Sequence, residues 1–236
     1  MFKALLIVPL YNHLPAFRRF APSLKETRIP VLVIDDGSSD GDAVQAFCTE
    51  MGFLYRRHPT NRGKGAALRT GLREARVLGF THALQIDADG QHVAADVIPF
   101  LEEAYVHQEA LINGFPFYDQ TAPRKRVKGR EITNFWVVRE THYRFFGDAM
   151  CGFRVYPLRL VEPFLKDLKA DGMGGDIEIL VHAIWHKIQI IPKMTRVTYP
   201  PDGVSHFRMV RDNWALTCLH ARLFFTALRR KPWKRR

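Results

Sequence analysis

Cysteine is scarce in this chain, and its three copies stand far apart. Cys48, Cys151 and Cys218 have no paired spacing within the 236 residues, so the sequence predicts neither a disulfide framework nor a zinc module. Disulfides persist in oxidising compartments, and we therefore expect a reducing, cytoplasmic setting for this protein.

Long apolar segments are missing as well. The best stretch, 214–228, carries His220 and Arg222 and is shorter than the ~20 apolar residues that span a bilayer. Residues 1–10 hold one lysine and a short apolar run without a small-residue cleavage site, so we expect a first buried strand there and no signal peptide.

Acidic residues are outnumbered by basic ones. The chain has 24 Asp and Glu against 35 Lys and Arg, a net charge of +11, which suits a polyanionic partner such as nucleic acid, an anionic membrane or a phosphorylated substrate. Hydrophobic residues make up 47%, which excludes wholesale disorder. The length favours one large α/β domain or a domain with an extension.

The first 90 residues alternate between short apolar runs and helical patterns, which predicts a parallel sheet with crossover helices. We expect strands at 4–9, 29–34, 53–56 and 83–86, and helices at 15–24, 42–51 and 65–78. Farther along, the basic stretch 123–130 predicts a mobile loop, 132–146, 176–186 and 205–230 predict helices, and 188–192 predicts a strand.

The strongest local pattern is the sequence DADGQ at 87–91, directly after an apolar strand. Side chains two residues apart in an extended segment face the same way, so Asp87, Asp89 and Gln91 can offer oxygen ligands to one divalent cation. Oxygen ligands favour Mg²⁺ or Mn²⁺ over zinc, and such a cation would screen the charge of a departing phosphate. The alternative is an acidic turn that only ends the strand.

Polar residues also follow two other predicted strands. Asp35 and Asp36 can accept hydrogen bonds from a base or a ribose, and Tyr11 and Asn12 supply an aromatic face and an amide. The sequence NRGKG at 61–65 places two cations before a helix, whose free amides and dipole are expected to attract anions. No Walker loop and no GxGxxG motif occurs, which disfavours nucleoside-triphosphate hydrolysis and dinucleotide binding.

Four motifs in order resemble those of family 2 glycosyltransferases with the GT-A fold: VPLYN at 8–12, VIDDGSSDG at 33–41, NRGKGAAL at 61–68 and QIDADGQH at 85–92. The resemblance continues into DAMCGFR at 148–154, which is similar to the acceptor-side segment of polyprenyl-phosphate glycosyltransferases, and into DIEIL at 176–180. It is nearest to the dolichol- or polyprenyl-phosphate mannosyltransferase branch. It implies an α/β fold of the GT-A type, Rossmann-like, with a mostly parallel central sheet flanked by helices and, here, a C-terminal amphipathic helix.

The resemblance also implies roles for individual residues. It assigns Asp87, Asp89 and Gln91 to a metal that bridges the donor's diphosphate, so Mg²⁺ or Mn²⁺ is the expected cofactor. It assigns catalytic roles to Asp176 and Arg154. The residues expected to contact the nucleotide sugar are Pro9, Tyr11, Asn12, Asp35, Asp36, Arg62, Lys64, Asp87, Ser205 and Arg208.

Asp176 allows two interpretations. An enzyme that acts on a hydroxyl needs a general base near the acceptor, and Asp176 stands where the family's aspartate falls; a phosphate acceptor needs no base. Alternatively, Asp176 caps the helix that follows Gly174 and Gly175, since aspartate is favoured at that position. The sequence alone leaves both roles open.

The C-terminal segment combines a helical apolar pattern with much of the chain's excess positive charge. Large apolar residues recur at steps of three and four from Phe207 to Leu228, and six of the last eight residues are basic. This pattern predicts an interfacial helix that holds the protein on an anionic membrane; a helix packed on the sheet, with a solvated tail, is the alternative. We divide the chain into a GT-A domain at 1–203 and an amphipathic helix with a basic tail at 204–236.

The expected function is metal-dependent, inverting transfer of a sugar from a nucleoside-diphosphate sugar to a membrane-associated acceptor, either a lipid or polyprenyl phosphate or a cell-envelope saccharide. The enzyme is expected to be peripheral on the inner face of the cell membrane, with an anionic membrane surface as a further partner. The alternative is a basic nucleic-acid-binding protein without catalysis. No helix-turn-helix, RNP or zinc-finger pattern occurs, so we expect no nucleic-acid partner.

Overall fold

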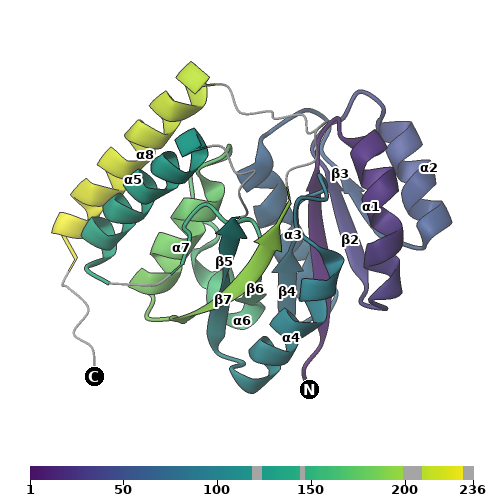
Figure 1. Cartoon of the computed structure of the whole chain (residues 1–236), viewed down its shortest axis with the longest axis horizontal. Helices are drawn as coiled ribbons and strands as arrows, with labels where there is room; N and C mark the ends of the chain where they lie inside the picture. Colours follow the sequence, from purple (N-terminus) through teal and green to yellow (C-terminus); the bar gives the residue numbers. More distant parts are fainter. Residues whose placement is uncertain (119–123, 144–146, 199–208, 231–236) are drawn as a thin grey trace.

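The computed structural model describes residues 1–118, 124–143, 147–198 and 209–230, without the side chains of 118 and 124–127. Within them lies a seven-stranded sheet in the order β3-β2-β1-β4-β6-β5-β7 (Figure 1). The strands are β1 (Ala4–Leu10), β2 (Val31–Asp35), β3 (Leu54–Arg57), β4 (His82–Gln85), β5 (Ala110–Tyr118), β6 (Arg154–Pro157) and β7 (Gln189–Val197). The helices are α1 (Leu14–Glu26), α2 (Gly41–Met51), α3 (Lys64–Val77), η1 (Ala94–Asp96), α4 (Val97–Val106), α5 (Arg124–Thr141), α6 (Leu158–Val161), η2 (Glu162–Phe164), α7 (Gly175–Trp185) and α8 (Met209–Leu228).

The first half of the sheet is parallel. β1 lies between β2 and β4 and is parallel to both, and β3 is parallel to β2 at the edge. β6 runs antiparallel to β4 and to β5, and β5 pairs in parallel with β7. Because β1, β2 and β4 share one direction, their carboxyl ends lie at the same edge of the sheet, which is where open α/β sheets bind ligands.

Side chains of β1 alternate between two hydrophobic cores. Leu5 and Ile7 pack on one face with α3 and α7, and Leu6 and Val8 pack on the other face with α1, α2 and α4. Residues two apart in a strand share a face, so a strand covered on both sides needs a continuous apolar run. The sheet is therefore enclosed by two helical layers, with α1 and α2 on the right of Figure 1 and α5 and α8 on the left.

The sequence patterns located most of these elements. All strands and helices expected before residue 90 are present, with ends that differ by a few residues. The helix expected at 176–186 is α7, and the strand expected at 188–192 is β7, which continues to Val197. α4 and β5 were not predicted. Asn113, Gly114 and Pro116 are poor strand formers, yet pairing with β6 and β7 holds them in β5.

The prediction of a mobile loop at 123–130 was wrong. From Arg124 on, this segment forms the first turns of α5. Lysine and arginine are good helix formers, so a cluster of them does not interrupt a helix. The helix is fixed to the domain by the buried Val137 and by an ion pair between Arg130 and Asp148.

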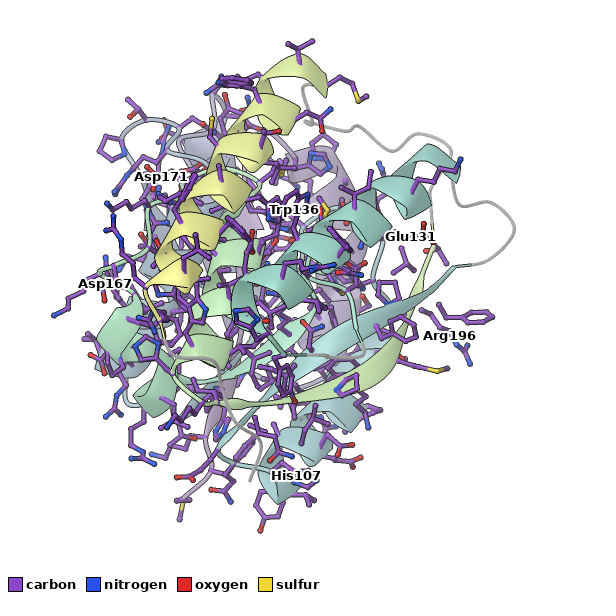
Figure 2. The ribbon with its side chains drawn as sticks, turned by 90° about the vertical axis from the view of Figure 1, so that its left-hand side faces the viewer. His107, Glu131, Trp136, Asp167, Asp171 and Arg196 are labelled. Atoms are coloured by element: carbon purple, nitrogen blue, oxygen red, sulfur yellow. The ribbon has the colours of Figure 1, made fainter. Side chains whose placement is uncertain are left out.

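α8 lies inside the range expected for a C-terminal helix. It packs beside α5 in the views of Figures 1 and 2, with Leu219, Leu223 and Ala227 buried, while Val210 and Trp214 of the expected apolar stripe are exposed. Among the described residues, no helix has the length and apolar character needed to cross a membrane. The boundary at 203 and 204 falls outside the described residues and stays a prediction.

His182 lies in the core on α7. Its ring is 5.7 Å from that of Phe164 and 5.1 Å from that of Trp185. Burial lowers the pKa of His182 to about 4, and the charge of His186 acts in the same direction. Because the unfolded chain binds this proton near pH 6.5, acidification favours unfolding.

We expect His182→Leu to flatten the dependence of stability on pH. Between pH 7 and pH 4.5 the wild-type chain should lose about 2 kcal/mol of unfolding free energy through this residue, because only the unfolded state gains the proton. Urea unfolding at both pH values checks this. An equal loss in the variant and the wild type would assign the acid sensitivity to other groups.

Candidate active site

The carboxyl ends of β1, β2 and β4 bring most of the expected site residues to one edge of the sheet. Pro9 pairs with Ile34 in the register of β1 and β2, and it is half-buried like Tyr11. Arg62 is exposed just before α3. The expected contacts Ser205 and Arg208 lie outside the described residues.

Asn12 links the turn after β1 to the turn after β2. Its side-chain oxygen accepts hydrogen bonds from the N–H and the hydroxyl of Ser39 at 2.9 and 3.2 Å, and its own N–H donates to Ser38 Oγ at 2.9 Å. Its φ of +48° is left-handed, which asparagine tolerates better than most residues. Asn12 therefore fixes the two predicted ligand-binding turns relative to each other.

Asp35 is fully buried at the end of β2 and is satisfied from within the protein. One carboxylate oxygen accepts a hydrogen bond from the N–H of Ser38 and the other accepts one from the hydroxyl of Tyr55, both at 2.8 Å. Arg57 Nε lies 3.5 Å from the second oxygen. Burial and the Asp35 carboxylate raise the pKa of Tyr55, which keeps its hydroxyl a donor.

Asp36 shapes the turn that leads into α3. Its Oδ1 lies 2.6 Å from His58 Nδ1 and accepts a hydrogen bond from the N–H of Arg62 at 3.0 Å. Its Oδ2 accepts one from the N–H of Gly63 at 2.6 Å. Both oxygens are therefore engaged, and the residue is 2% exposed. The structure gives Asp36 a positioning role, and its contact with a nucleoside stays a prediction.

The amino terminus of α3 is covered by the protein itself. The N–H groups of Gly65 and Ala66 donate to the carbonyl oxygens of Gly172 and Asp171 at 3.2 and 3.0 Å. A loop that is distant in sequence has therefore already satisfied two of the amides that were expected to attract an anion, and anion binding at this turn stays a prediction.

Lys64 occupies the centre of the site. Its ammonium nitrogen lies 2.8 Å from both carboxylate oxygens of Asp87, donating a hydrogen bond to Oδ2, and 3.1 Å from Oδ2 of Asp176. Burial lowers the pKa of Lys64, but the charges of Asp176 and Asp87 outweigh burial and raise it above its ordinary value. Lys64 is therefore positively charged throughout the physiological pH range.

Asp176 lies in the first turn of α7 but does not cap it. The N-cap position belongs to Gly174, and no side chain makes a cap hydrogen bond there. Instead, Asp176 Oδ1 accepts a hydrogen bond from Gln85 Nε2 at 2.9 Å, and Oδ2 faces Lys64. The Tyr156 hydroxyl donates to Gln85 Oε1 at 2.8 Å, which turns the amide nitrogen of Gln85 toward Asp176. The helix-cap interpretation is therefore not supported.

Arg154 pairs with Gln85, the last residue of β4, at the edge of the sheet where the site lies. It is fully buried, and its guanidinium donates hydrogen bonds to the carbonyl oxygens of Asp148, Ala149 and Asp176. These bonds connect the loop before β6 to the start of α7. The geometry gives Arg154 a positioning role, and the catalytic role that the resemblance implied stays a prediction.

Asp87 and Asp89 have the chemistry of the expected metal site. Asp87 Oδ1 accepts no hydrogen bond from the described residues, and its ion-pair partner is the Lys64 ammonium at 2.8 Å. Burial and the neighbouring charge of Asp87 raise the pKa of Asp89 to about 6, as expected for two carboxylates that lack a full counter-charge. The N–H of Gln91 donates to Asp89 Oδ1 at 2.9 Å.

The protein alone does not supply a complete metal centre in the described residues. They contain no group of three or more His, Cys, Asp or Glu side chains that could hold an ion. A cation at Asp87 and Asp89 would therefore need further oxygen ligands, such as the Gln91 amide or the phosphates of a bound donor.

Gly152 borders the site although it was not among the predicted residues. A Cβ at this position would lie 2.7 Å from Asp87 Oδ2 and 2.8 Å from Lys64 Nζ, so the backbone here closes directly on the ion pair. The sequence feature that could have identified Gly152 is its place in the motif at 148–154. Gln85 and Tyr156 were also missed, because a buried polar side chain on a strand follows no sequence pattern.

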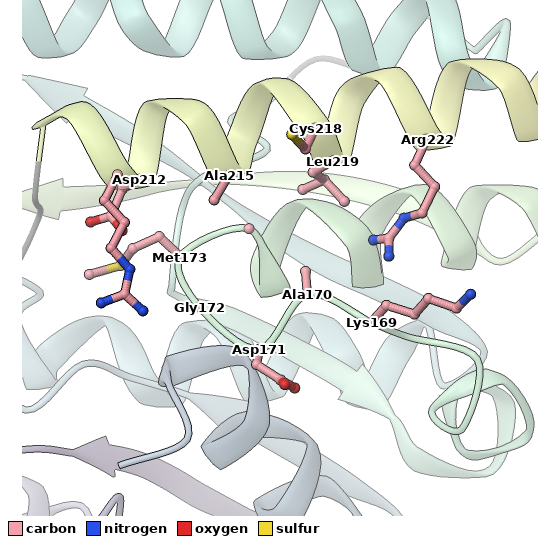
Figure 3. A pocket seen from close by; sticks show the side chains of 12 residues that line it. Lys169, Ala170, Asp171, Gly172, Met173, Asp212, Ala215, Cys218, Leu219 and Arg222 are labelled. Atoms are coloured by element: carbon pink, nitrogen blue, oxygen red, sulfur yellow. The ribbon is translucent and has the colours of Figure 1, made fainter.

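A groove of about 420 Å³ lies between α8 and the loop at 169–174, which leads into α7 two residues before Asp176 (Figure 3). Leu219 and Arg222 point from α8 toward this loop. Arg222 donates to Glu178 Oε1 at 2.6 Å, and Glu178 Oε2 accepts the N–H of Lys169 at 2.8 Å. The lining combines apolar side chains with Lys169, Arg211 and Arg222 and with the acidic Asp171 and Asp212.

The sequence profile described as Glycosyl transferase family 2 matches residues 5–161. The chain therefore belongs to glycosyltransferase family 2 and is an enzyme of that family. The match spans the strand ends that carry Asp35, Asp36, Asp87 and Asp89, so the family assignment covers most of the candidate site.

Individual proteins agree with this assignment. An uncharacterized protein of Methanocaldococcus jannaschii is 25% identical over 215 residues, 85% of this chain and 90% of that protein. The UDP-N-acetylglucosamine--dolichyl-phosphate N-acetylglucosaminyltransferase of Methanococcus voltae is 27% identical over 207 residues, 78% of this chain and 81% of that protein. Glucosyl-3-phosphoglycerate synthase from Mycobacterium tuberculosis, solved in complex with UDP, has a TM-score of 0.66 at 15% identity over 96% of this chain and 80% of that chain. The predicted GT-A fold is confirmed.

We expect Asp36→Ala to destabilise the protein in the absence of any ligand. The change leaves the buried donors of His58, Arg62 and Gly63 without their acceptor, which should cost about 3 kcal/mol of unfolding free energy. Urea unfolding measures this. Asp42→Ala, at a fully exposed carboxylate paired with Arg57, is the control and should change stability little. If the ligand-free Asp36→Ala variant had the same unfolding free energy as the control, the positioning role of Asp36 would be contradicted.

Proposed function

We propose that this enzyme transfers a sugar, with inversion, from a nucleoside-diphosphate sugar to a lipid-phosphate or saccharide acceptor with the help of Mg²⁺ or Mn²⁺. The observation that carries the proposal is the cluster of Lys64, Asp87 and Asp176 at the carboxyl edge of the sheet. It brings a permanent cation and two carboxylates together where the family's donor is expected to lie.

On the donor side, the residues available to a nucleotide are Tyr11, Arg62 and the side chains around Asp87. Support for a uridine nucleotide comes from the Mycobacterium tuberculosis structure, which holds UDP, and from the Methanococcus voltae relative, which is named for UDP-N-acetylglucosamine. Asp87 and Asp89, with Gln91, would hold the cation, whose chemistry is to neutralise charge on the leaving diphosphate. Lys64 is placed to stabilise the same charge.

On the acceptor side, the role of Asp176 depends on the attacking group. A hydroxyl acceptor needs a base, and Asp176 offers a carboxylate oriented by Gln85 and 5% exposed. A lipid phosphate is already anionic and needs no base. With that acceptor, the role of Asp176 is to hold Lys64 in position. The dolichyl-phosphate named for the Methanococcus voltae relative favours the lipid phosphate.

The metal assignment predicts that Asp89→Ala folds normally but loses manganese-dependent binding of UDP. We expect affinity to fall at least tenfold, about 1.4 kcal/mol, because the cation loses one of its two carboxylates. Calorimetric titration with UDP, with and without Mn²⁺, measures this, and Asp42→Ala serves as the matched control. Undiminished manganese-dependent binding in Asp89→Ala would contradict the assignment.

The base assignment predicts that Asp176→Asn separates two acceptor classes. With a hydroxyl acceptor, kcat should fall by about 10² to 10⁴ while the KM for the donor stays within a few-fold, because a general base acts on the chemical step. With dolichyl phosphate, the loss should be much smaller. Initial rates with a short oligosaccharide and with dolichyl phosphate test this. A large loss of kcat with the phosphate acceptor would rule out a role limited to holding Lys64.

A further inference from the structure

α8 has two apolar faces, and only one of them packs on the domain. Leu219, Leu223 and Ala227 are buried. Val210, Trp214, Phe225 and Leu228 are 64% to 87% exposed. Positions 210, 214, 225 and 228 recur at the helical period, so their side chains form one stripe on the side of the helix that faces away from the domain.

α5 continues this stripe sideways with exposed aromatic rings. The ring of Phe135 lies 5.8 Å from that of Trp136, Trp136 lies 6.2 Å from Phe224, and Phe224 lies 6.1 Å from Phe225. Four aromatic side chains thus form an unbroken row from α5 across to α8. Figures 1 and 2 both show these two helices side by side, and Trp136 lies between them in Figure 2.

Arginines accompany this apolar surface. Arg211 and Arg229 are separated by a whole number of helical turns and therefore follow one flank of the stripe on α8. On α5, the guanidinium of Arg139 lies 5.1 Å from the centre of the Phe135 ring. The surface is thus apolar and aromatic in the middle and cationic along its edges. We call it the α5–α8 face and define it by Phe135, Trp136, Val210, Trp214, Phe225 and Leu228.

We propose that the α5–α8 face docks on an anionic lipid surface, with α8 lying in the plane of the headgroups. Aromatic rings beside arginines suit the boundary between acyl chains and headgroups, where the rings contact the chains and the guanidinium groups meet lipid phosphates. This role rests on the proposed function. Docking would bring the enzyme to the membrane that holds a lipid acceptor.

The charge pattern favours a bilayer over a second copy of this chain. In a self-complementary interface, two copies of the surface bordered by Arg211 and Arg229 would face each other, since such an interface repeats the same surface on both sides. On an anionic bilayer the same arginines are attracted. This attraction falls as salt screens it.

The test compares two double variants of the full chain. Trp214→Ser with Phe225→Ser removes two exposed apolar residues from the α5–α8 face, and Val77→Ser with Val106→Ser removes two exposed apolar residues from the ends of α3 and α4. Co-sedimentation with vesicles of phosphatidylcholine, with and without phosphatidylglycerol, measures binding at low and high salt. We expect wild type and the α3–α4 variant to bind anionic vesicles at low salt and the α5–α8 variant to bind at least tenfold more weakly.

Two outcomes would overturn the proposal. Equal vesicle binding by the two double variants would assign the attachment to the basic residues after α8. A concentration-dependent dimer that the α5–α8 variant loses, in a wild type that ignores vesicles, would assign the face to a second copy of the chain. Light scattering on the same samples detects that dimer.

Titration of UDP with Mn²⁺ into the same variants keeps the two proposals apart. Normal UDP binding with lost vesicle binding supports both the donor site and the α5–α8 face. Vesicle binding that depends on the face, in a protein that binds no UDP, would leave the docking surface standing and remove the donor site. The α5–α8 residues take no part in the donor site, so neither result follows from the other.

Discussion

The site depends on the ion pairs that the Lys64 ammonium group forms with Asp87 and Asp176. Asp87, half-buried, comes from the end of β4, and Asp176, buried, comes from the start of α7. The cation between these two carboxylates favours the ionised form of both. Lys64 is available because it begins α3, the helix that crosses between β3 and β4. Removing either carboxylate would leave a buried charge with a single partner, which is why the site joins three elements as one electrostatic unit.

This unit is only possible because backbones approach one another closely around it. At Gly65 and Gly175, the first turns of α3 and α7 are so close that a Cβ on either would meet the backbone of the other. At Gly152, the segment before β6 closes on the ion pair. Side chains at these positions would separate the carriers of Lys64, Asp176 and Asp87. The glycines therefore act on the chemistry through distance, without touching a substrate.

α8 is attached to the domain by charge as well as by its apolar face. Its His220 Nδ1 lies 2.7 Å from the fully buried Glu140 of α5, and its Arg222 donates to the buried Glu178 of α7. Both carboxylates would be costly to bury alone, so α8 completes the packing of the two helices beneath it. With one side fixed in this way, the outward stripe is presented in a set orientation. The exposed stripe and the packed face of α8 therefore stay on opposite sides of a helix that is held in place.

The sequence by itself determined the strands and helices of the first 90 residues and the edge where Asp35, Asp36, Asp87 and Asp89 gather, because apolar period and turn residues are local properties. The GT-A fold class followed from the resemblance of its motifs to those of family 2 glycosyltransferases. The sequence could not determine which partners those carboxylates take. Asp36 accepts hydrogen bonds from the 62–63 backbone, and Arg154 donates hydrogen bonds to backbone carbonyl oxygens. The tertiary structure decides these contacts. The same holds for α8: periodicity predicted a helix, but only packing against α5 and α7 decided which apolar residues are buried and which remain exposed, since a helix with apolar groups on two sides offers both equally to the core.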